Sequence, residues 1–403
     1  MISWFLRLFV LVPLSVLLLN GCGGGGGSSS GSTSTGSVPT ADCNAAATPP
    51  TLASNQALMS VSQNPSISGY STVNLPYVTV TVCNGTNCKS IDHVVVDSGS
   101  YGLRLLHSVA SSLGFSTAPT FYECAQFLSG YMWGGVYNAS VQIAGEATSS
   151  PIPIEIIDDD NTASMAPPPF SCTSGNSSIG TLNGIGGNGL LGVGPFIADN
   201  GNYYQCTGST CITAVVPTAN QVSNPVAFFA VDNNGLIMQM PAVSGLACPS
   251  AAGSITFGID TQTNNSLQNY STLALDNSGN FTAAYSGQIF NSSFIDSGSN
   301  YNFLIIPGMS YDNNGNYRPT QYTTISPVTF TPNTGPPASI TTSLGVIDPY
   351  VLNSTYTAVN DIAALGSAGS ADFGMPFFYG KSIATVIAGH HVSEGNGPMY
   401  ALH

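Results

Sequence analysis

The sequence contains the tetrapeptide Asp-Ser-Gly-Ser twice, each time directly after a short apolar run. The first copy is His93-Val-Val-Val-Asp97-Ser-Gly-Ser100 and the second is Ser293-Phe-Ile-Asp296-Ser-Gly-Ser299. Two carboxyl groups held about 3 Å apart cannot both ionise easily, so they share one proton. One carboxylate can then act as a base toward water while the other carboxyl donates its proton, which suits hydrolysis without a metal or a nucleophilic side chain.

The two copies also share their downstream context. Asp97 and Asp296 are 199 residues apart (296 − 97), and each is followed further along the chain by an apolar stretch leading into glycine. These stretches are Gly189-Leu-Leu-Gly192 and Phe373-Gly374. A single Asp-Ser-Gly-Ser in a chain this rich in Ser and Gly is more often a turn. Two copies with the same flanks indicate an internal repeat.

The elements that must position these carboxyls are predicted to be strands. From about residue 70 the chain is a series of short alternating or apolar runs separated by Gly, Asn, Asp and Pro, which is typical of strands and turns. Examples are Tyr77–Val82, His93–Val96, Ala139–Ile143 and Ser254–Phe257. Leu103–Leu113 is a candidate for a short helix. We therefore expect an all-β or mostly β protein.

With these residues in view, the chain from about residue 70 to the C-terminus resembles the pepsin-like aspartic peptidases. Each of the two lobes of those enzymes supplies an Asp-Thr/Ser-Gly-Ser/Thr loop. The chain is also similar to a group of bacterial lipoproteins of this layout. The resemblance implies two related β-barrel lobes with a cleft between them, here an N-terminal lobe of residues 67–262 and a C-terminal lobe of residues 263–403.

The resemblance also implies roles for the residues of both loops. Asp97 and Asp296 would be the catalytic pair. The glycines would let the backbone turn tightly beside the carboxyls, the first serines would tie the two loops together, and the second serines would hydrogen-bond the outer carboxylate oxygens. These supporting residues are Ser98, Gly99, Ser100, Ser297, Gly298 and Ser299.

Other family features are less well matched. The family covers its cleft with a hairpin flap bearing a Tyr, and residues 121–145 lie in the corresponding place. The Tyr position falls near Phe127, with Tyr131 or Trp133 as possible substitutes. Arg104 stands where the family has a Trp, and Met375 where it often has an acidic residue. These departures leave a second reading open, a pepsin-fold protein that binds but does not cleave.

The N-terminus predicts export and a lipid anchor. Residues 1–21 combine Arg7 with an apolar run of twelve residues, too short to span a bilayer, which needs about 20, and typical of a signal peptide. They lead to Cys22 in a sequence resembling the bacterial lipobox. A Gly/Ser/Thr/Pro-rich stretch then predicts a flexible tether over residues 22–66. We expect an outer-membrane lipoprotein, on the periplasmic face or the cell surface of a Gram-negative bacterium.

The cysteines indicate disulfides. Cys22 aside, eight cysteines remain, an even number in an exported chain. Cys83 and Cys88 bracket one predicted turn, and Cys206 and Cys211 bracket another, so both pairs are candidates for local bridges. Three pairings remain open for the others, which are Cys43, Cys124, Cys172 and Cys248.

Charge narrows the possible partners. The chain has 19 Asp and Glu against 5 Lys and Arg, so a polyanion such as nucleic acid would be repelled. Gly184–Gly189 matches a dinucleotide fingerprint, but no βαβ pattern surrounds it. Asp158–Asp160 is more simply a solvated loop than a calcium site. We expect no cofactor or metal, a monomer, and a peptide or protein as substrate of an aspartic endopeptidase.

Overall fold

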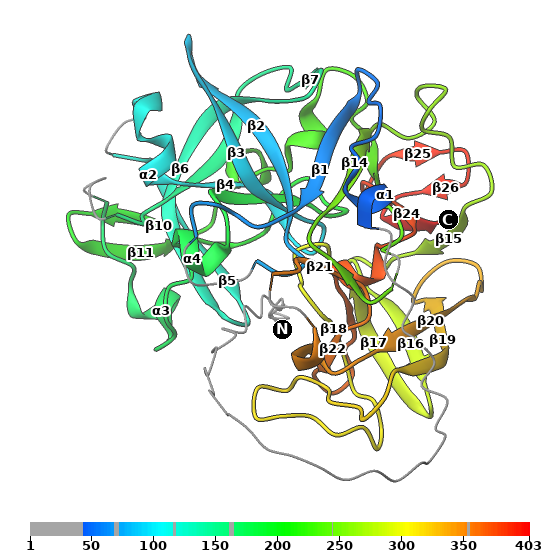
Figure 1. Ribbon diagram of the computed structural model, residues 1–403. Coiled ribbons are helices and arrows are strands. Elements are labelled where there is room, and N and C mark those ends of the chain that lie inside the picture. Colours follow the sequence, from blue (N-terminus) through cyan, green and yellow to red (C-terminus); the bar gives the residue numbers. More distant parts are fainter. Residues whose placement is uncertain (1–42, 68–71, 116–117, 161–164, 244, 353–354) are drawn as a thin grey trace, which may run out of the picture.

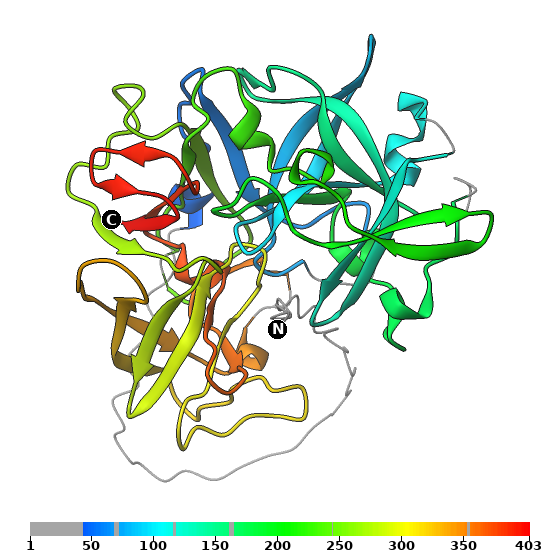
Figure 2. The same cartoon turned by 180° about the vertical axis from the view of Figure 1, so that it is seen from behind.

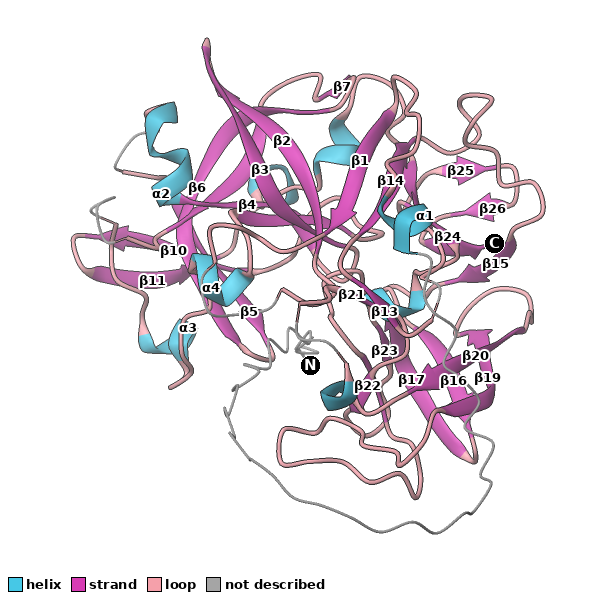
Figure 3. Cartoon of the chain, in the orientation of Figure 1, coloured by secondary structure: helices cyan, strands magenta, loops and turns pink. Residues whose placement is uncertain are grey.

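The computed structural model describes residues 43–67, 72–115, 118–160, 165–243, 245–352 and 355–403. The predicted signal peptide, Cys22 and residues 23–42 of the predicted tether lie outside the described residues. Strands dominate the described part of the chain, as predicted (Figure 3). No helix in that part is long and apolar enough to cross a membrane.

Most strands of the N-terminal half join three strands of the C-terminal half in one sheet of sixteen strands (Figure 1). In order across the sheet they are β11 (Thr210–Ala214), β10 (Asn202–Thr207), β5 (Phe121–Phe127), β6 (Gly130–Ile143), β8 (Ile152–Ile157), β4 (Tyr101–Leu106), β9 (Gly189–Val193), β3 (Asn87–Asp97), β2 (Pro76–Asn84), β1 (Gln56–Val61), β14 (Ala251–Phe257), β12 (Gly235–Gln239), β24 (Ser382–Val386), β27 (Met399–Leu402) and β15 (Ser271–Ala274), with β7 (Glu146–Ala147) paired to β6.

The C-terminal half contributes a second sheet of seven strands. In order they are β20 (Ile340–Val346), β19 (Thr323–Pro332), β16 (Phe281–Tyr285), β17 (Gln288–Ile295), β23 (Asp372–Phe373), β18 (Asn302–Leu304) and β22 (Ala363–Leu365). Two short ladders pair β13 (Ala247–Cys248) with β21 (Ala358–Val359), and β25 (His391–Val392) with β26 (Gly395–Asn396). Seen from behind, this sheet forms a separate body beside the larger one (Figure 2).

The described helices are short. They are α1 (Cys43–Ala47), α2 (His107–Ala110), α3 (Phe170–Thr173) and α4 (Leu182–Ile185), with 3-10 turns at Ser111–Leu113, Thr218–Asn220, Pro225–Phe228, Pro349–Val351 and Met375–Phe377. The helix predicted over residues 103–113 is wrong in its first part, because residues up to Leu106 belong to β4. Leu103 and Leu105 are fully buried, and a buried apolar run gives no periodicity that separates strand from helix.

The predicted tether is too long. Residues 56–61 form β1, which pairs antiparallel with β14 and also contacts β2. Its Met59 and Val61 are fully buried in the main core. The folded body therefore reaches back at least to Cys43, because burial of these side chains and the backbone pairing outweigh a polar, Pro-rich composition.

Four disulfides close the described chain. The two local bridges predicted for the turns, Cys83–Cys88 and Cys206–Cys211, are confirmed. Among the three open pairings the structure has Cys43–Cys248 and Cys124–Cys172. The first of these joins α1 to β13, 205 residues away.

Candidate active site

Each Asp-Ser-Gly-Ser loop lies at the C-terminal end of a strand. β3 ends at Asp97 and runs parallel to β9, with Asp97 opposite Gly192. β17 ends just before Asp296 and runs parallel to β23, with Ile295 opposite Phe373. The apolar-Gly stretches noted in the sequence thus lie beside the two Asp-bearing strands in equivalent ways, which gives the repeat its structural meaning.

Glycine is required where these stretches pass the loops. A Cβ on Gly192 would lie 2.6 Å from the backbone of Tyr101, and one on Gly374 would lie 2.1 Å from the carbonyl oxygen of Tyr301. Either distance is far inside van der Waals contact. The close approach lets Gly194 N–H donate to Ser100 O over 2.9 Å, and Met375 N–H donate to Ser299 O over 2.7 Å.

The first serines of the two loops hold the halves together through four hydrogen bonds. The Ser297 N–H donates to Ser98 Oγ (2.9 Å), and the Ser98 N–H donates to Ser297 Oγ (3.0 Å). Each hydroxyl in turn donates across to the other half, Ser98 to Ile295 O (3.0 Å) and Ser297 to Val96 O (2.8 Å). Both serines are buried, so these bonds fix the two loops face to face.

The structure brings Asp97 and Asp296 together, both of them buried. A Cβ on Gly99 would lie 2.3 Å from Cγ of Asp296, so only glycine allows the second carboxyl to reach the first loop. The Oδ1 atoms accept hydrogen bonds from Gly99 N–H and Gly298 N–H, each over 2.8 Å. Burial raises the pKa of Asp296 well above its usual value, and the neighbouring charge of Asp97 and then that of Asp372 raise it further.

The second serines contact the remaining carboxyl oxygens, but not in the same way. Ser100 donates a short hydrogen bond to Asp97 Oδ2. Ser299 Oγ lies 3.1 Å from Asp296 Oδ2 and only 2.6 Å from Oδ2 of a third buried carboxyl, Asp372. Sequence reasoning missed Asp372, although an acidic residue inside the apolar stretch before Gly374 was a visible signal.

The predicted flap is a hairpin of β5 and β6 that turns at residues 128–129. Phe127 is buried in a core cluster with Leu75 and Tyr77. Trp133 is also buried, donates from its indole N–H to Ala166 O (2.7 Å) and stacks on Tyr122. Tyr131, the third candidate, is partly buried against the cluster around Trp133.

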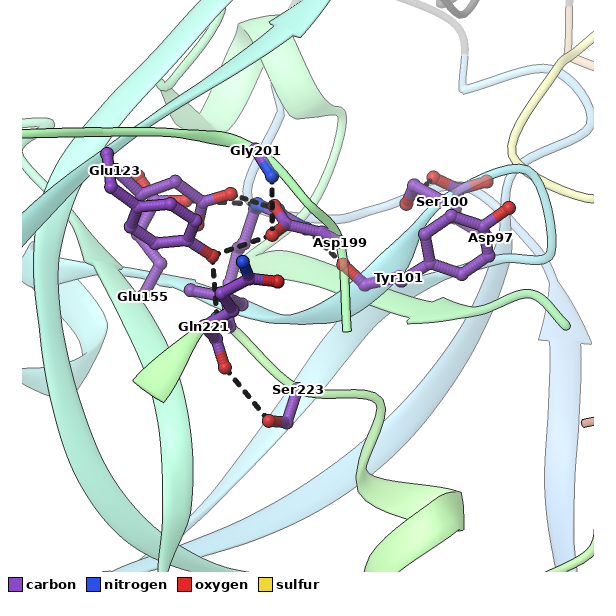
Figure 4. A network of polar contacts seen from close by, with 12 residues as sticks. Asp97, Ser100, Tyr101, Glu123, Glu155, Asp199, Gly201, Gln221 and Ser223 are labelled. Atoms are coloured by element: carbon purple, nitrogen blue, oxygen red, sulfur yellow. Dashed lines mark hydrogen bonds and ion pairs between the residues drawn. The ribbon is translucent and has the colours of Figure 1, made fainter. Parts of the chain in front are cut away.

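Arg104 connects the hairpin to the first loop through a buried charge cluster. Figure 4 labels its partners Tyr101, Glu123, Glu155 and Asp199. Its Nη1 donates to Tyr101 O (2.7 Å), directly after the loop. Its Nη2 lies 2.6 Å from Glu123 of β5 and 2.5 Å from Asp199, and its Nε lies 3.0 Å from Glu155 of β8. The sequence did not predict that Arg104 has three acidic partners.

This cluster contains three carboxyl groups and only one guanidinium. Burial opposes ionisation of Arg104, yet the three carboxylates outweigh that effect and raise its pKa. Burial raises the pKa of Glu123 well above its usual value, and Arg104 only partly offsets this. For the same reason the pKa of Glu155 is raised to about 7. The cluster therefore retains protons well above the pH at which carboxyl groups ordinarily lose them.

In the described part of the chain, no three His, Cys, Asp or Glu side chains are grouped so that they could hold a metal ion. The Asp158–Asp160 segment packs on α2 instead. Asp159 accepts from the N–H and the hydroxyl of Ser108, and Asp160 contacts His107 Nδ1 at 3.0 Å.

Comparison with known proteins gives a family and a fold. A family model described as "Protein of unknown function (DUF3443)" matches residues 51–402. No curated protein matches the chain. Among solved structures, the chain is similar to an aspartic proteinase from Irpex lacteus, with a TM-score of 0.51 and 16% identity, covering 86% of this chain and 96% of that one. At this identity the likeness bears on the fold alone, and it confirms the predicted bilobal, mostly β, pepsin-like fold.

Proposed function

The chain belongs to the DUF3443 family, and we propose that it is an aspartic endopeptidase that hydrolyses peptide bonds with a water activated by Asp97 and Asp296. The observation that carries this proposal is that two buried carboxyls lie on loops which Ser98 and Ser297 bind to each other through reciprocal hydrogen bonds. The fold shared with an aspartic proteinase adds support.

The chemistry follows from the pair of carboxyls. A water between them would lose a proton to the ionised carboxylate while its oxygen attacks the peptide carbonyl carbon, and the protonated carboxyl would donate to the carbonyl oxygen. The resulting tetrahedral diol would break its C–N bond as the amine nitrogen takes up a proton. The products are a carboxylic acid and an amine, and the dyad again shares one proton.

We propose further that the enzyme is exported and held at the outer membrane by a lipid on Cys22. The lipobox-like sequence and the glycine- and serine-rich stretch behind it support this. Radioactive palmitate should label the wild-type chain in a Gram-negative host, and the Cys22→Ser variant should remain unlabelled. Equal labelling of both would refute the anchor.

The dyad is tested by cleavage of a denatured protein between pH 3 and 7. The full mature chain in detergent is compared with Asp97→Asn and Asp296→Asn, and we expect each variant to lose activity by at least 10²–10⁴-fold, roughly the share of general acid–base catalysis. Asp92→Asn is the matched control, because its side chain is 68% exposed and five residues from Asp97.

Truncation at residue 67 must be avoided in this test, since it would remove β1 and Cys43. Activity that survives in both Asn variants would refute the dyad. A folded wild type without activity at any pH would favour the alternative function, a catalytically inactive pepsin-fold lipoprotein that acts as a binding module.

A further inference from the structure

A third carboxyl extends the proposed dyad away from the reacting water. Asp372, on β23, is 2% exposed, and Ser299 lies between it and Asp296. The contacts run from Asp296 Oδ2 to Ser299 Oγ over 3.1 Å and from Ser299 Oγ to Asp372 Oδ2 over 2.6 Å. Asp372 and Ser299 are 73 residues apart in sequence, so the fold alone creates this chain of contacts.

Counting protons decides how the contacts work. A serine hydroxyl has one proton to donate, so Ser299 cannot donate to both carboxylates at once. The 2.6 Å contact has the length of a hydrogen bond from a hydroxyl to an ionised oxygen, about 2.5–2.7 Å. The 3.1 Å contact lies beyond the usual range for hydroxyl donors. Ser299 therefore donates to Asp372, and its contact with Asp296 is favourable when Asp296 carries a proton.

The other half of the site differs. Ser100 donates to Asp97 Oδ2, and Gly99 N–H donates to Oδ1. The backbone bond has a counterpart on the second loop, from Gly298 N–H to Asp296 Oδ1, so the two halves differ in where the serine hydroxyl donates. On the second loop the hydroxyl is directed away from the dyad, and the charge of Asp372 opposes ionisation of Asp296.

From these contacts we propose that Asp372 is a positioning residue that acts through Ser299 to keep the shared proton on Asp296 and leave Asp97 as the base. The assignment rests on the proposed peptidase function and deepens it, because it gives each carboxyl one role. Asp296 donates to the substrate carbonyl, and Asp97 takes the proton from water. In this assignment Asp372 contacts neither the substrate nor the water.

The test replaces Asp372 with Asn in the full mature chain. Loss of the charge should let Ser299 donate to Asp296, so that Asp296 ionises at a pH lower by about one unit. Two readouts are followed. The first is the alkaline limb of kcat/KM for a peptide, which should move down by the same amount. The second is the infrared carbonyl band of protonated, ¹³C-labelled Asp296, identified by its loss in Asp296→Asn, which requires no catalysis.

Asp276→Asn is the matched control, a turn residue of the same half that accepts backbone hydrogen bonds from Ser278 and Asn280. It should leave both readouts unchanged. If circular dichroism shows that Asp372→Asn is unfolded, Asp372→Ser takes its place, because it also removes the charge. It must shift the titration of Asp296 in the same direction. A merely structural role would lower Tm without moving the titration.

The outcomes separate the two proposals. A shifted infrared titration in a protein that cleaves nothing would refute the peptidase and keep the proton assignment. Cleavage with an unmoved titration and an unmoved alkaline limb would keep the peptidase and overturn the role of Asp372.

Discussion

At the scale of single residues, Ser98 and Ser297 join the two halves of the molecule. Ser98→Ala would remove the acceptor of Ser297 N–H, which is buried. A buried donor without a partner costs about 1–3 kcal/mol, so we expect the free energy of unfolding to fall by that amount. Cleavage should fall as well, because the loops lose their fixed spacing.

Urea denaturation measures this effect, with Ser98→Thr as the variant that keeps the hydroxyl and Ser112→Ala as an exposed control. Thr should retain most of the stability. If Ser98→Ala proves as stable as Ser112→Ala, the two hydrogen bonds of the Ser98 hydroxyl contribute little to joining the halves.

The residues of the two loops could be predicted from the sequence because their signal is local. Each Asp, Ser and Gly stands at a fixed distance from an apolar strand, and the repeat marks them twice. Asp372 stands outside the repeated tetrapeptide, and its acidic side chain within an apolar stretch is its only signal. Its place in the site depends on β23 lying beside β17 and β18, a pairing of segments that nothing in a single sequence specifies.

At the scale of elements, Arg104 and its partners connect β4, β5 and β8 behind the first loop. The pKa of Glu155 is about 7 in the folded protein, against about 4.3 in an unfolded chain. Between these values the folded state binds more protons than the unfolded state, so the free energy of unfolding falls as pH rises through this window. Across this window the titration of Glu155 lowers the free energy of unfolding by on the order of 2–3 kcal/mol.

Glu155→Gln removes this titration. We expect the variant to lose less unfolding free energy between pH 5 and pH 8 than the wild type does, as measured by urea denaturation at both values. Exposed Glu394→Gln is the control and should follow the wild type. An equal loss in Glu155→Gln would show that the charge cluster does not titrate in this range.

Elements were predicted well where alternation or turns marked them, and poorly where pairing decided them. The apolar run before Asp97 was expected to be a strand and is part of β3. β1 was expected to be tether because its neighbours are polar, although its residues alternate between more and less buried positions once β14 is beside it. Register with a distant partner is the missing information in both β1 and β4.

At the scale of the whole molecule, stability depends on a long-range disulfide and on the balance of charged side chains. The Cys43–Cys248 disulfide holds the N-terminal segment against β13, and the sequence could not select it from three possible pairings. The balance of acidic and basic side chains, in contrast, follows directly from the amino-acid composition. With 19 acidic and only 5 Lys and Arg side chains, repulsion is strong at neutral pH and weak where the carboxyls neutralise.

Repulsion between surface carboxylates and ionisation of buried carboxyls both predict that Tm is higher near pH 4.5 than near pH 8. The salt dependence of Tm distinguishes the two contributions. About 1 M NaCl reduces the Debye length to about 3 Å and screens exposed charges, but it acts much less on Glu123, Glu155 and Asp296, which are buried. We expect salt to raise Tm at pH 8 more than at pH 4.5 and to leave part of the pH dependence in place. That remainder should shrink in Glu155→Gln. A Tm as high at pH 8 as at pH 4.5, without salt, would contradict both contributions.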